Sequence, residues 1–171
     1  MMTRSATLIT MSIAIVAQAL SMRTKPVPRL LWNASASVPI GLYSVEPVDQ
    51  LAVTDLVVAM PSNSLATFRA ERGYVPLRVP LIKRILALRG QSVCRNELVI
   101  SVDGITMGMA LVHDRRGRPL PIWQGCRVIA QNEVFLMNWD EPASFDGRYF
   151  GPISLRAIIG LATPLWTFEK P

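Results

Sequence analysis

From Gly41 onward the sequence consists of short runs rich in Val, Ile and Leu, separated by Gly, Pro, Asn and Asp. Runs of this length, bounded by turn residues, are typical of β-strands. We expect strands at Gly41–Val45, Asp55–Met60, Leu81–Leu88, Leu98–Val102, Arg127–Ile129, Glu133–Asn138 and Ile158–Leu161. The fold is therefore predicted to be mainly β.

One helix is predicted within this β pattern, over Ser62–Arg72. Ser62 or Asn63 can cap its start, and Gly73 ends the run. With 171 residues, the chain is long enough for one domain of ordinary size and a short appendage.

A hairpin is predicted at Asp103–Gly104, because this dipeptide favours a two-residue turn between strands Leu98–Val102 and Ile105–Met109. The hairpin and a basic loop both lie between the two cysteines of the chain. Residues 94–126 are therefore expected to form a small β subdomain inserted into the main sheet.

The N-terminal segment, residues 1–24, contains an apolar run of about 17 residues, which is short for a membrane-spanning helix and long for a cleaved signal. Both fates stay open. Ala17-Gln18-Ala19 fits the small-residue pattern of a signal cleavage site, whereas retention would leave a single membrane anchor. Arg23, Lys25 and Arg29 follow the run and outnumber Arg4 before it, which by charge alone favours an inside location for residues 25–171.

The net charge of +6 would permit nucleic acid or an anionic lipid surface as a partner. Its distribution argues against nucleic acid. Several cations flank the apolar run, and the tight cluster Arg115, Arg116 and Arg118 lacks interleaved aromatic residues. Lipid headgroups or a solvated loop explain these cations more simply.

The two cysteines, Cys94 and Cys126, are either free or joined in a disulfide. In an exported domain, a bridge between them would close a loop of about 33 residues and contribute about 3 to 4 kcal/mol in the chain-entropy model. No metal site is expected, because two thiols and the single distant His113 cannot make a four-ligand cage.

The run Pro80–Gly90 places two cations, Lys83 and Arg84, in an otherwise apolar strand. Burial favours the neutral form of a lysine amine, which is a competent general base near neutral pH, whereas arginine stays protonated. Lys83 is thus the candidate base. The alternative is that Lys83 extends to solvent from an edge strand that it protects against aggregation.

The polar segment Asn33–Tyr43 contains two serines, Ser35 and Ser37, and Pro39 and Gly41 follow at once. This composition is typical of a linker between a membrane segment and a domain. It also suits a nucleophile, because a turn or an extended corner at Ser37 leaves the hydroxyl exposed. A serine and a buried lysine can form a catalytic dyad without histidine.

Three segments in order resemble the signature boxes of the type I signal peptidases: S-A-S-V-P, L-I-K-R-I-L-A-L-R-G and S-F-D-G-R-Y-F-G-P-I. The G-L-Y after the first box and G-R-P-L-P-I-W-Q-G-C are similar to the TraF branch, the conjugative transfer peptidases. The resemblance covers essentially the whole chain and implies a signal-peptidase/LexA-like β fold. Residues 25–171 would then be a signal-peptidase-like catalytic domain.

The resemblance also implies roles for individual residues. Ser37 matches the acyl-forming nucleophile and Lys83 the general base, while Ser35 matches an oxyanion-hole serine. The last box carries three supporting matches. Ser144 matches a serine that orients the lysine, and Asp146 and Arg148 match an acid and a base that brace the site, on one face if the segment is extended.

The family implies an acyl-enzyme that water or an amine releases, without a cofactor. TraF-type enzymes trim propilin and join its ends, so the implied partners are a propilin or another exported protein, the inner membrane and the conjugative transfer machinery. The implied location is periplasmic, at or anchored to that membrane, which overrides the weak charge evidence. Two departures from housekeeping signal peptidases stand out: a proline two positions after Ser37, and M-N-W-D-E-P-A before the last box. The second puts the substrate preference in doubt.

Three other functions are weighed against a Ser/Lys peptidase. The first is a non-catalytic, membrane-tethered scaffold of the mating-pair or pilus assembly. The second, a Ser-His-Asp hydrolase that uses His113, lacks a Gly-x-Ser-x-Gly motif. The third, a LexA-type repressor, lacks room for a DNA-binding domain.

Overall fold

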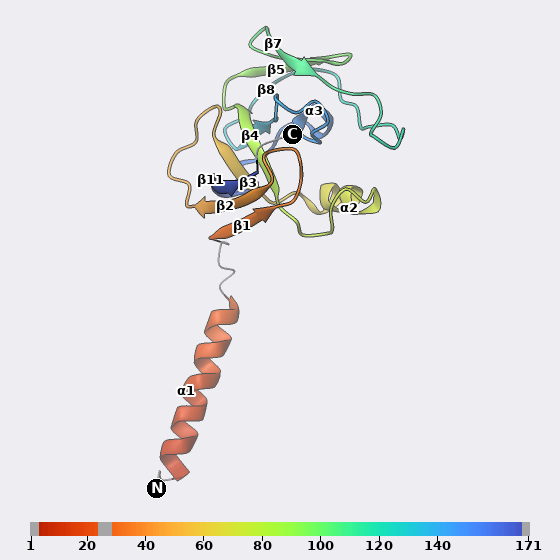
Figure 1. The fold of residues 1–171 in the computed structure, drawn as a ribbon. Coiled ribbons are helices and arrows are strands. Elements are labelled where there is room, and N and C mark those ends of the chain that lie inside the picture. Colours follow the sequence, from red (N-terminus) through yellow and green to blue (C-terminus); the bar gives the residue numbers. More distant parts are fainter. Residues whose placement is uncertain (1–3, 24–28, 169–171) are drawn as a thin grey trace.

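The computed structural model describes residues 4–23 and 29–168, and strands make up most of its regular structure (Figure 1). The strands are β1 Leu30–Asn33, β2 Gly41–Glu46, β3 Leu56–Ala59, β4 Leu81–Ala87, β5 Ser92–Asn96, β6 Val99–Val102, β7 Ile105–Met109, β8 Gly125–Val128, β9 Glu133–Leu136, β10 Ile153–Ser154 and β11 Ile158–Thr167. The helices are α1 Arg4–Arg23, α2 Asn63–Glu71, α3 Gly147–Phe150 and the 3-10 turn η1 Leu155–Ala157. The predicted mainly β class is confirmed.

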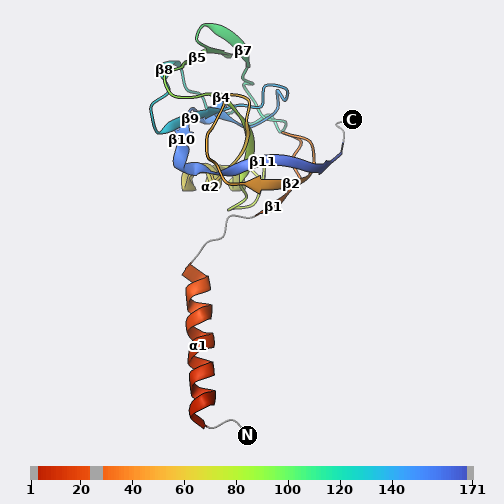
Figure 2. The same cartoon turned by 90° about the vertical axis from the view of Figure 1, so that its left-hand side faces the viewer.

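The strands form two antiparallel sheets (Figures 1 and 2). The larger sheet has seven strands in the order β1-β2-β11-β3-β4-β9-β10, and the smaller has four in the order β7-β6-β5-β8. The smaller sheet is built from one continuous stretch, residues 92–128. A shared apolar cluster joins the two sheets, with Leu86 and Phe135 from the larger and Val93 and Ile100 from the smaller.

Strand β4 is central to the larger sheet, because β3 pairs with one of its edges and β9 with the other. Its first half alternates as the sequence predicts, and Leu81 and Ile85 share one apolar cluster. A register shift between Ile85 and Ala87 then breaks the alternation, so that Ala87 packs with Leu86 against the smaller sheet. Strict alternation along the strand would place Ala87 on the side of Ile85, and the bulge is what turns it to the other side.

Most predicted elements occur within a few residues of their expected bounds. The Asp103–Gly104 hairpin is confirmed, with positive φ at both residues (49° and 83°). The helix over residues 62–72 is also confirmed, and Ser62 caps it by accepting a hydrogen bond from the N–H of Leu65 (3.4 Å). The sequence pattern does not reveal β1, β5 and β10, which are short or carry several polar residues.

Helix α1 lies apart from the β domain in Figures 1 and 2, and its described side chains from Thr7 to Val16 are exposed. Within residues 4–23 and 29–168, no helix has both the length and the mean hydropathy that a membrane crossing needs. The predicted division into residues 1–24 and 25–171 falls in a segment outside the described residues, so it stays a prediction.

Gly41, four residues after Ser37, lies very close to the backbone of strand β11. A Cβ atom there would lie 2.1 Å from the carbonyl oxygen of Trp166 in β11. Gly90 also has positive φ (87°), but a Cβ atom at that position would meet nothing within 4 Å. Replacing either glycine strains the backbone, and only Gly41→Ala also forces two strands apart.

We therefore expect Gly90→Ala to lower the free energy of unfolding by about 1 kcal/mol and Gly41→Ala to lower it by about 3 kcal/mol. Urea denaturation followed by circular dichroism measures both losses. Equal losses would show that the β2–β11 approach is looser than described.

Candidate active site

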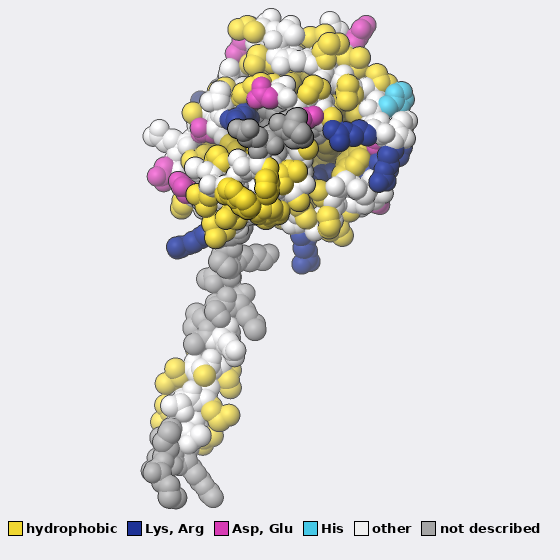
Figure 3. All heavy atoms as spheres, in the orientation of Figure 1, with side chains coloured by type: hydrophobic (Ala, Val, Ile, Leu, Met, Phe, Trp, Pro, Cys, Tyr) yellow, Lys and Arg dark blue, Asp and Glu magenta, His cyan; other side chains and the backbone are white. Residues whose placement is uncertain are grey.

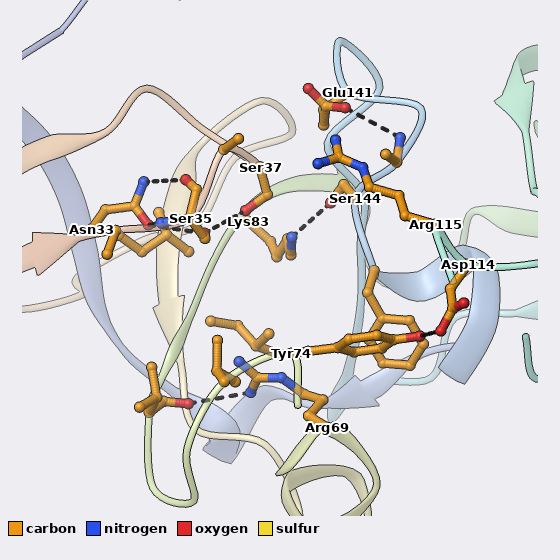
Figure 4. Close-up of a pocket in the computed structure, with 18 of the residues that line it drawn as sticks. Asn33, Ser35, Ser37, Arg69, Tyr74, Lys83, Asp114, Arg115, Glu141 and Ser144 are labelled. Atoms are coloured by element: carbon orange, nitrogen blue, oxygen red, sulfur yellow. Dashed lines mark hydrogen bonds between the residues drawn. The ribbon is translucent and has the colours of Figure 1, made fainter. Parts of the chain in front are cut away.

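A cavity of about 750 Å³ lies where the turn between β1 and β2 faces strand β4 (Figure 4). The α2–β4 connection, the 111–120 loop and the 141–149 segment complete its walls. Ser37, Lys83 and Ser144 all line it, although they lie more than 40 residues apart in the sequence. The fold thus brings together the three residues on which a Ser/Lys dyad would depend.

Lys83 is buried in the centre of β4, with 3% of its surface exposed. Its Nζ donates a hydrogen bond to Ser144 Oγ at 2.6 Å. Burial lowers the pKa of Lys83 to about 8; the charge of Asp146 opposes this shift, and those of Arg69 and Arg148 add to it. The interpretation of Lys83 as a solvent-reaching residue on an edge strand is wrong, because β4 is paired on both edges.

Arg84, the other cation of the strand, has a different environment. It is partly exposed, and its guanidinium lies over the ring of Trp139 and donates to the carbonyl of Thr54 (3.2 Å). Only Lys83 is therefore both buried and next to a serine hydroxyl in the cavity.

Ser37 occupies a turn that leaves its side chain partly exposed to the cavity, as Figure 4 shows. Its Oγ lies 3.1 Å from Ser35 Oγ, within hydrogen-bond distance. Its carbonyl oxygen accepts a hydrogen bond from the side-chain amide of Asn138 (2.7 Å). The linker interpretation does not account for a backbone that is held by a buried side chain 101 residues further along the chain.

Asn33, which is 6% exposed, organises the turn from within. Its Nδ2 donates to the carbonyls of Ser35, Val38 and Pro39, and its Oδ1 accepts from both the N–H and the Oγ of Ser35. Sequence reasoning does not identify this role. Only an amide at the end of strand β1 could have indicated this role, and the sequence pattern does not predict that strand.

Asn138, which is 3% exposed, connects the turn to the rest of the site. Besides holding Ser37, it accepts from the N–H of Arg84 (2.9 Å) and donates its own N–H to Asp146 Oδ2 (3.1 Å). It is a second positioning residue that sequence reasoning does not identify. It belongs to the M-N-W-D-E-P-A segment, which from sequence alone is only a departure from the family pattern.

Asp146 and Arg148 form a buried ion pair, with Nε–Oδ1 and Nη2–Oδ2 distances of 2.9 Å. Arg148 also donates to the carbonyls of Asn138, Glu141 and Ser144. The pair therefore fixes the backbone of the loop that carries Ser144. It braces the site without lining the cavity.

The segment that carries this ion pair is helical, so the condition under which Asp146 and Arg148 would share one face of a strand is not met. Asp146 caps helix α3 by accepting from the N–H of Arg148 (3.2 Å), and Gly151, with φ 72°, ends the helix before Pro152. A capping carboxylate reaches two residues ahead, and the guanidinium folds back to it. The two side chains meet by helix capping and not by sharing the face of a strand.

The remaining residues that the sequence analysis singled out have different positions. Cys94 and Cys126 are opposite each other on β5 and β8 and are joined by a disulfide, with a Cα–Cα distance of 4.0 Å.

His113 is exposed and is not among the residues that line the cavity, which leaves the Ser-His-Asp interpretation without support. Arg115, Arg116 and Arg118 do line the cavity, a position that the interpretation as a solvated or lipid-facing loop does not anticipate.

Comparisons with known proteins show which family the chain resembles. Residues 2–166 match the family described as signal peptidase, peptidase S26. The chain is 33% identical over 147 residues to a plasmid transfer protein TraF of Escherichia coli, covering 80% of this chain and 82% of that protein. It is 34% identical over 146 residues to a conjugal transfer protein TraF of Agrobacterium fabrum, with coverage of 80% and 82%. A solved signal peptidase I of Enterococcus faecalis has a TM-score of 0.41 and 16% identity, covering 68% of this chain and 100% of that one, a likeness too weak to carry an argument.

The contacts of Asn138 lead to a stability prediction. Asn138→Ala would leave the N–H of Arg84 and the carbonyl of Ser37 without their partner, so we expect a loss of about 2 to 4 kcal/mol in the free energy of unfolding. Asn96→Ala, at an exposed position in β5, is the matched control and should change it by less than about 0.5 kcal/mol. Similar effects of the two variants in urea denaturation would contradict a bridging role for Asn138.

Proposed function

This chain belongs to the signal peptidase family, peptidase S26, and we propose that it is a serine endopeptidase with Ser37 as nucleophile and Lys83 as general base. One observation carries the proposal: the buried amine of Lys83 and the accessible hydroxyl of Ser37 line the same cavity. A lysine amine in this environment loses its proton far more readily than one in water.

The reaction follows from these two groups. The neutral Lys83 Nζ accepts the hydroxyl proton of Ser37 while Oγ attacks the carbonyl carbon of the scissile peptide bond. The tetrahedral intermediate collapses as the protonated amine returns that proton to the leaving nitrogen, which gives an ester on Ser37 and a free amine product. Water then releases the acyl group as an acid, or an amine releases it as a new amide.

Ser144 and Ser35 have supporting roles in this mechanism. Ser144 Oγ accepts from Lys83 Nζ and thereby aims the amine into the cavity. Ser35 Oγ donates to Asn33 in the resting site (3.0 Å), so rotation of its hydroxyl would supply a donor to the developing oxyanion together with the backbone N–H of Ser37.

The proposed substrate is a membrane-inserted propilin, which the enzyme trims and whose ends it joins for conjugative pilus assembly and plasmid transfer. The names of the similar proteins, plasmid transfer protein and conjugal transfer protein, support this class of process. Apolar side chains such as Leu31, Ala36, Leu81 and Ile82 line the cavity near the dyad and suit small apolar residues beside the cleaved bond.

We further propose a periplasmic location at the inner membrane. The apolar N-terminal segment supports membrane attachment, and the disulfide supports an oxidising compartment. Trp32, Trp166 and Phe168 form an exposed aromatic cluster, with ring centroids 4.8 to 6.3 Å apart. Such rings favour the membrane–water interface, and hydrophobic side chains gather on the side of the domain nearest the N-terminal segment (Figure 3).

The peptidase and scaffold hypotheses are separated by Ser37→Ala and Lys83→Ala in cells that carry the cognate plasmid. We expect both variants to leave the propilin at its unprocessed mass and to abolish plasmid transfer, because each removes one half of the dyad. Intact-mass spectrometry of the pilin detects this, and a product lighter by one water than the trimmed chain identifies ring closure.

Ser64→Ala and Arg78→Ala, at exposed positions outside the cavity, are the matched controls and should leave processing unchanged. Normal pilin processing in the Ser37→Ala or Lys83→Ala strain would contradict the peptidase proposal and favour the non-catalytic scaffold hypothesis.

A further inference from the structure

Arg69 is a buried cation in the same cavity as the dyad, and the mechanism above does not use it. It belongs to the last turn of α2, has 5% of its surface exposed and lines the cavity. Figure 4 shows it across the cavity from Ser35 and Ser37. Its charge is one of the causes that lower the pKa of Lys83, after burial.

The guanidinium of Arg69 has few partners. It donates one hydrogen bond, from Nη1 to the carbonyl of Val79 (3.2 Å). Among the residues that the structure describes, no carboxylate lies within 4.0 Å of it. Burial lowers its pKa to about 10, in keeping with a charge that has lost water without gaining a counter-ion.

The nearby acid Asp114 is already occupied. Its Oδ2 accepts from Tyr74 (2.6 Å) and lies 2.8 Å from Nη2 of Arg118. Its Oδ1 accepts from the backbone N–H groups of Arg116 and Arg118. Asp114 is thus engaged in holding its own loop. Glu141 is the other acid that lines the cavity, so two acids there face the four guanidinium groups of Arg69, Arg115, Arg116 and Arg118, and the excess of positive charge remains.

The position of Arg69 is fixed relative to the dyad. The neighbouring Phe68 stacks on Phe145, with ring centroids 5.4 Å apart, and Phe145 stacks on Tyr149. Phe145 directly follows Ser144, the hydrogen-bond partner of Lys83. Helix α2 is therefore packed against the segment that orients the base, and a group held by Arg69 is held at a defined place in the site.

A guanidinium of this kind pairs best with a planar anion that accepts two parallel hydrogen bonds. A peptide substrate supplies one such anion, a carboxylate. We propose that Arg69 is a specificity residue that binds a carboxylate of the substrate, on the side chain of an Asp or Glu near the cleaved bond or at the C-terminus. The inference rests on the proposed peptidase function and adds to it a charged recognition element beside the apolar lining.

Binding to the full chain carrying Ser37→Ala tests the inference without any cleavage. The probes are amidated alanine octapeptides with one Glu at successive positions, their Gln counterparts, and a Gln peptide with a free C-terminal carboxylate, all titrated by calorimetry. We expect one acidic probe to bind at least about tenfold more tightly than its neutral counterpart, as befits a charge-assisted bidentate contact. A gain for a Glu probe assigns the site to a side chain, and a gain for the free acid assigns it to the C-terminus.

Adding Arg69→Gln should remove this gain, and Arg69→Lys should keep part of it, because lysine retains the charge without the planar fork. Arg78→Gln, which removes an equal charge from an exposed residue outside the cavity, should preserve it. Equal or absent binding of acidic and neutral probes, or a gain that persists in Arg69→Gln, would overturn the inference. Failure of the peptidase proposal would appear separately, as normal processing in the Ser37→Ala strain.

Discussion

The hydrogen bond between Lys83 Nζ and Ser144 Oγ, 2.6 Å long and closed off from solvent, is the interaction on which the rest of the site depends. A buried lysine on an interior strand of a seven-stranded sheet loses the hydration of its charge, and one neutral hydroxyl offers little compensation. The amine is consequently poised between its charged and neutral forms near physiological pH. This property, unhelpful for stability, is what a general base requires.

The surrounding polar residues keep this costly arrangement in place. Arg148 bonds to Asp146 and to three carbonyls of the loop before Ser144, so a single guanidinium defines where that hydroxyl lies. Asn138 joins the same network to the carbonyl of Ser37 and to β4. Because these groups are nearly fully buried, loss of any one leaves partners unpaired, and the network behaves as a unit. The turn after β1 and the loop after β9 are thereby held on two sides of one cavity.

The sequence predicts the strands, the hairpin at Asp103–Gly104 and the helix after Ser62, because each follows from local periodicity or turn chemistry. It also predicts Lys83 as the base candidate, since a cation within an apolar strand stands out. The roles of Asn33 and Asn138 cannot be predicted from the sequence, because an asparagine in a polar segment does not stand out until its hydrogen-bond partners are known. The helical form of residues 147–150 cannot be predicted for a different reason: four residues are too few for a periodic signal, and the capping carboxylate of Asp146 decides the outcome. The candidate catalytic residues are thus easier to predict than those that hold them in position.

Burial keeps Lys83 ready to accept a proton in the cavity that it shares with Ser37. The chain contains only three lysines, Lys25, Lys83 and Lys170, so ¹³C labelling at lysine Cε and nuclear magnetic resonance resolve each amine during a pH titration, with Lys83→Met identifying its signal. If Lys83 is the general base, its signal should titrate with a midpoint near 8, well below the usual lysine value of about 10.4. A Lys83 signal that titrates together with the other two, near the usual value, would contradict it.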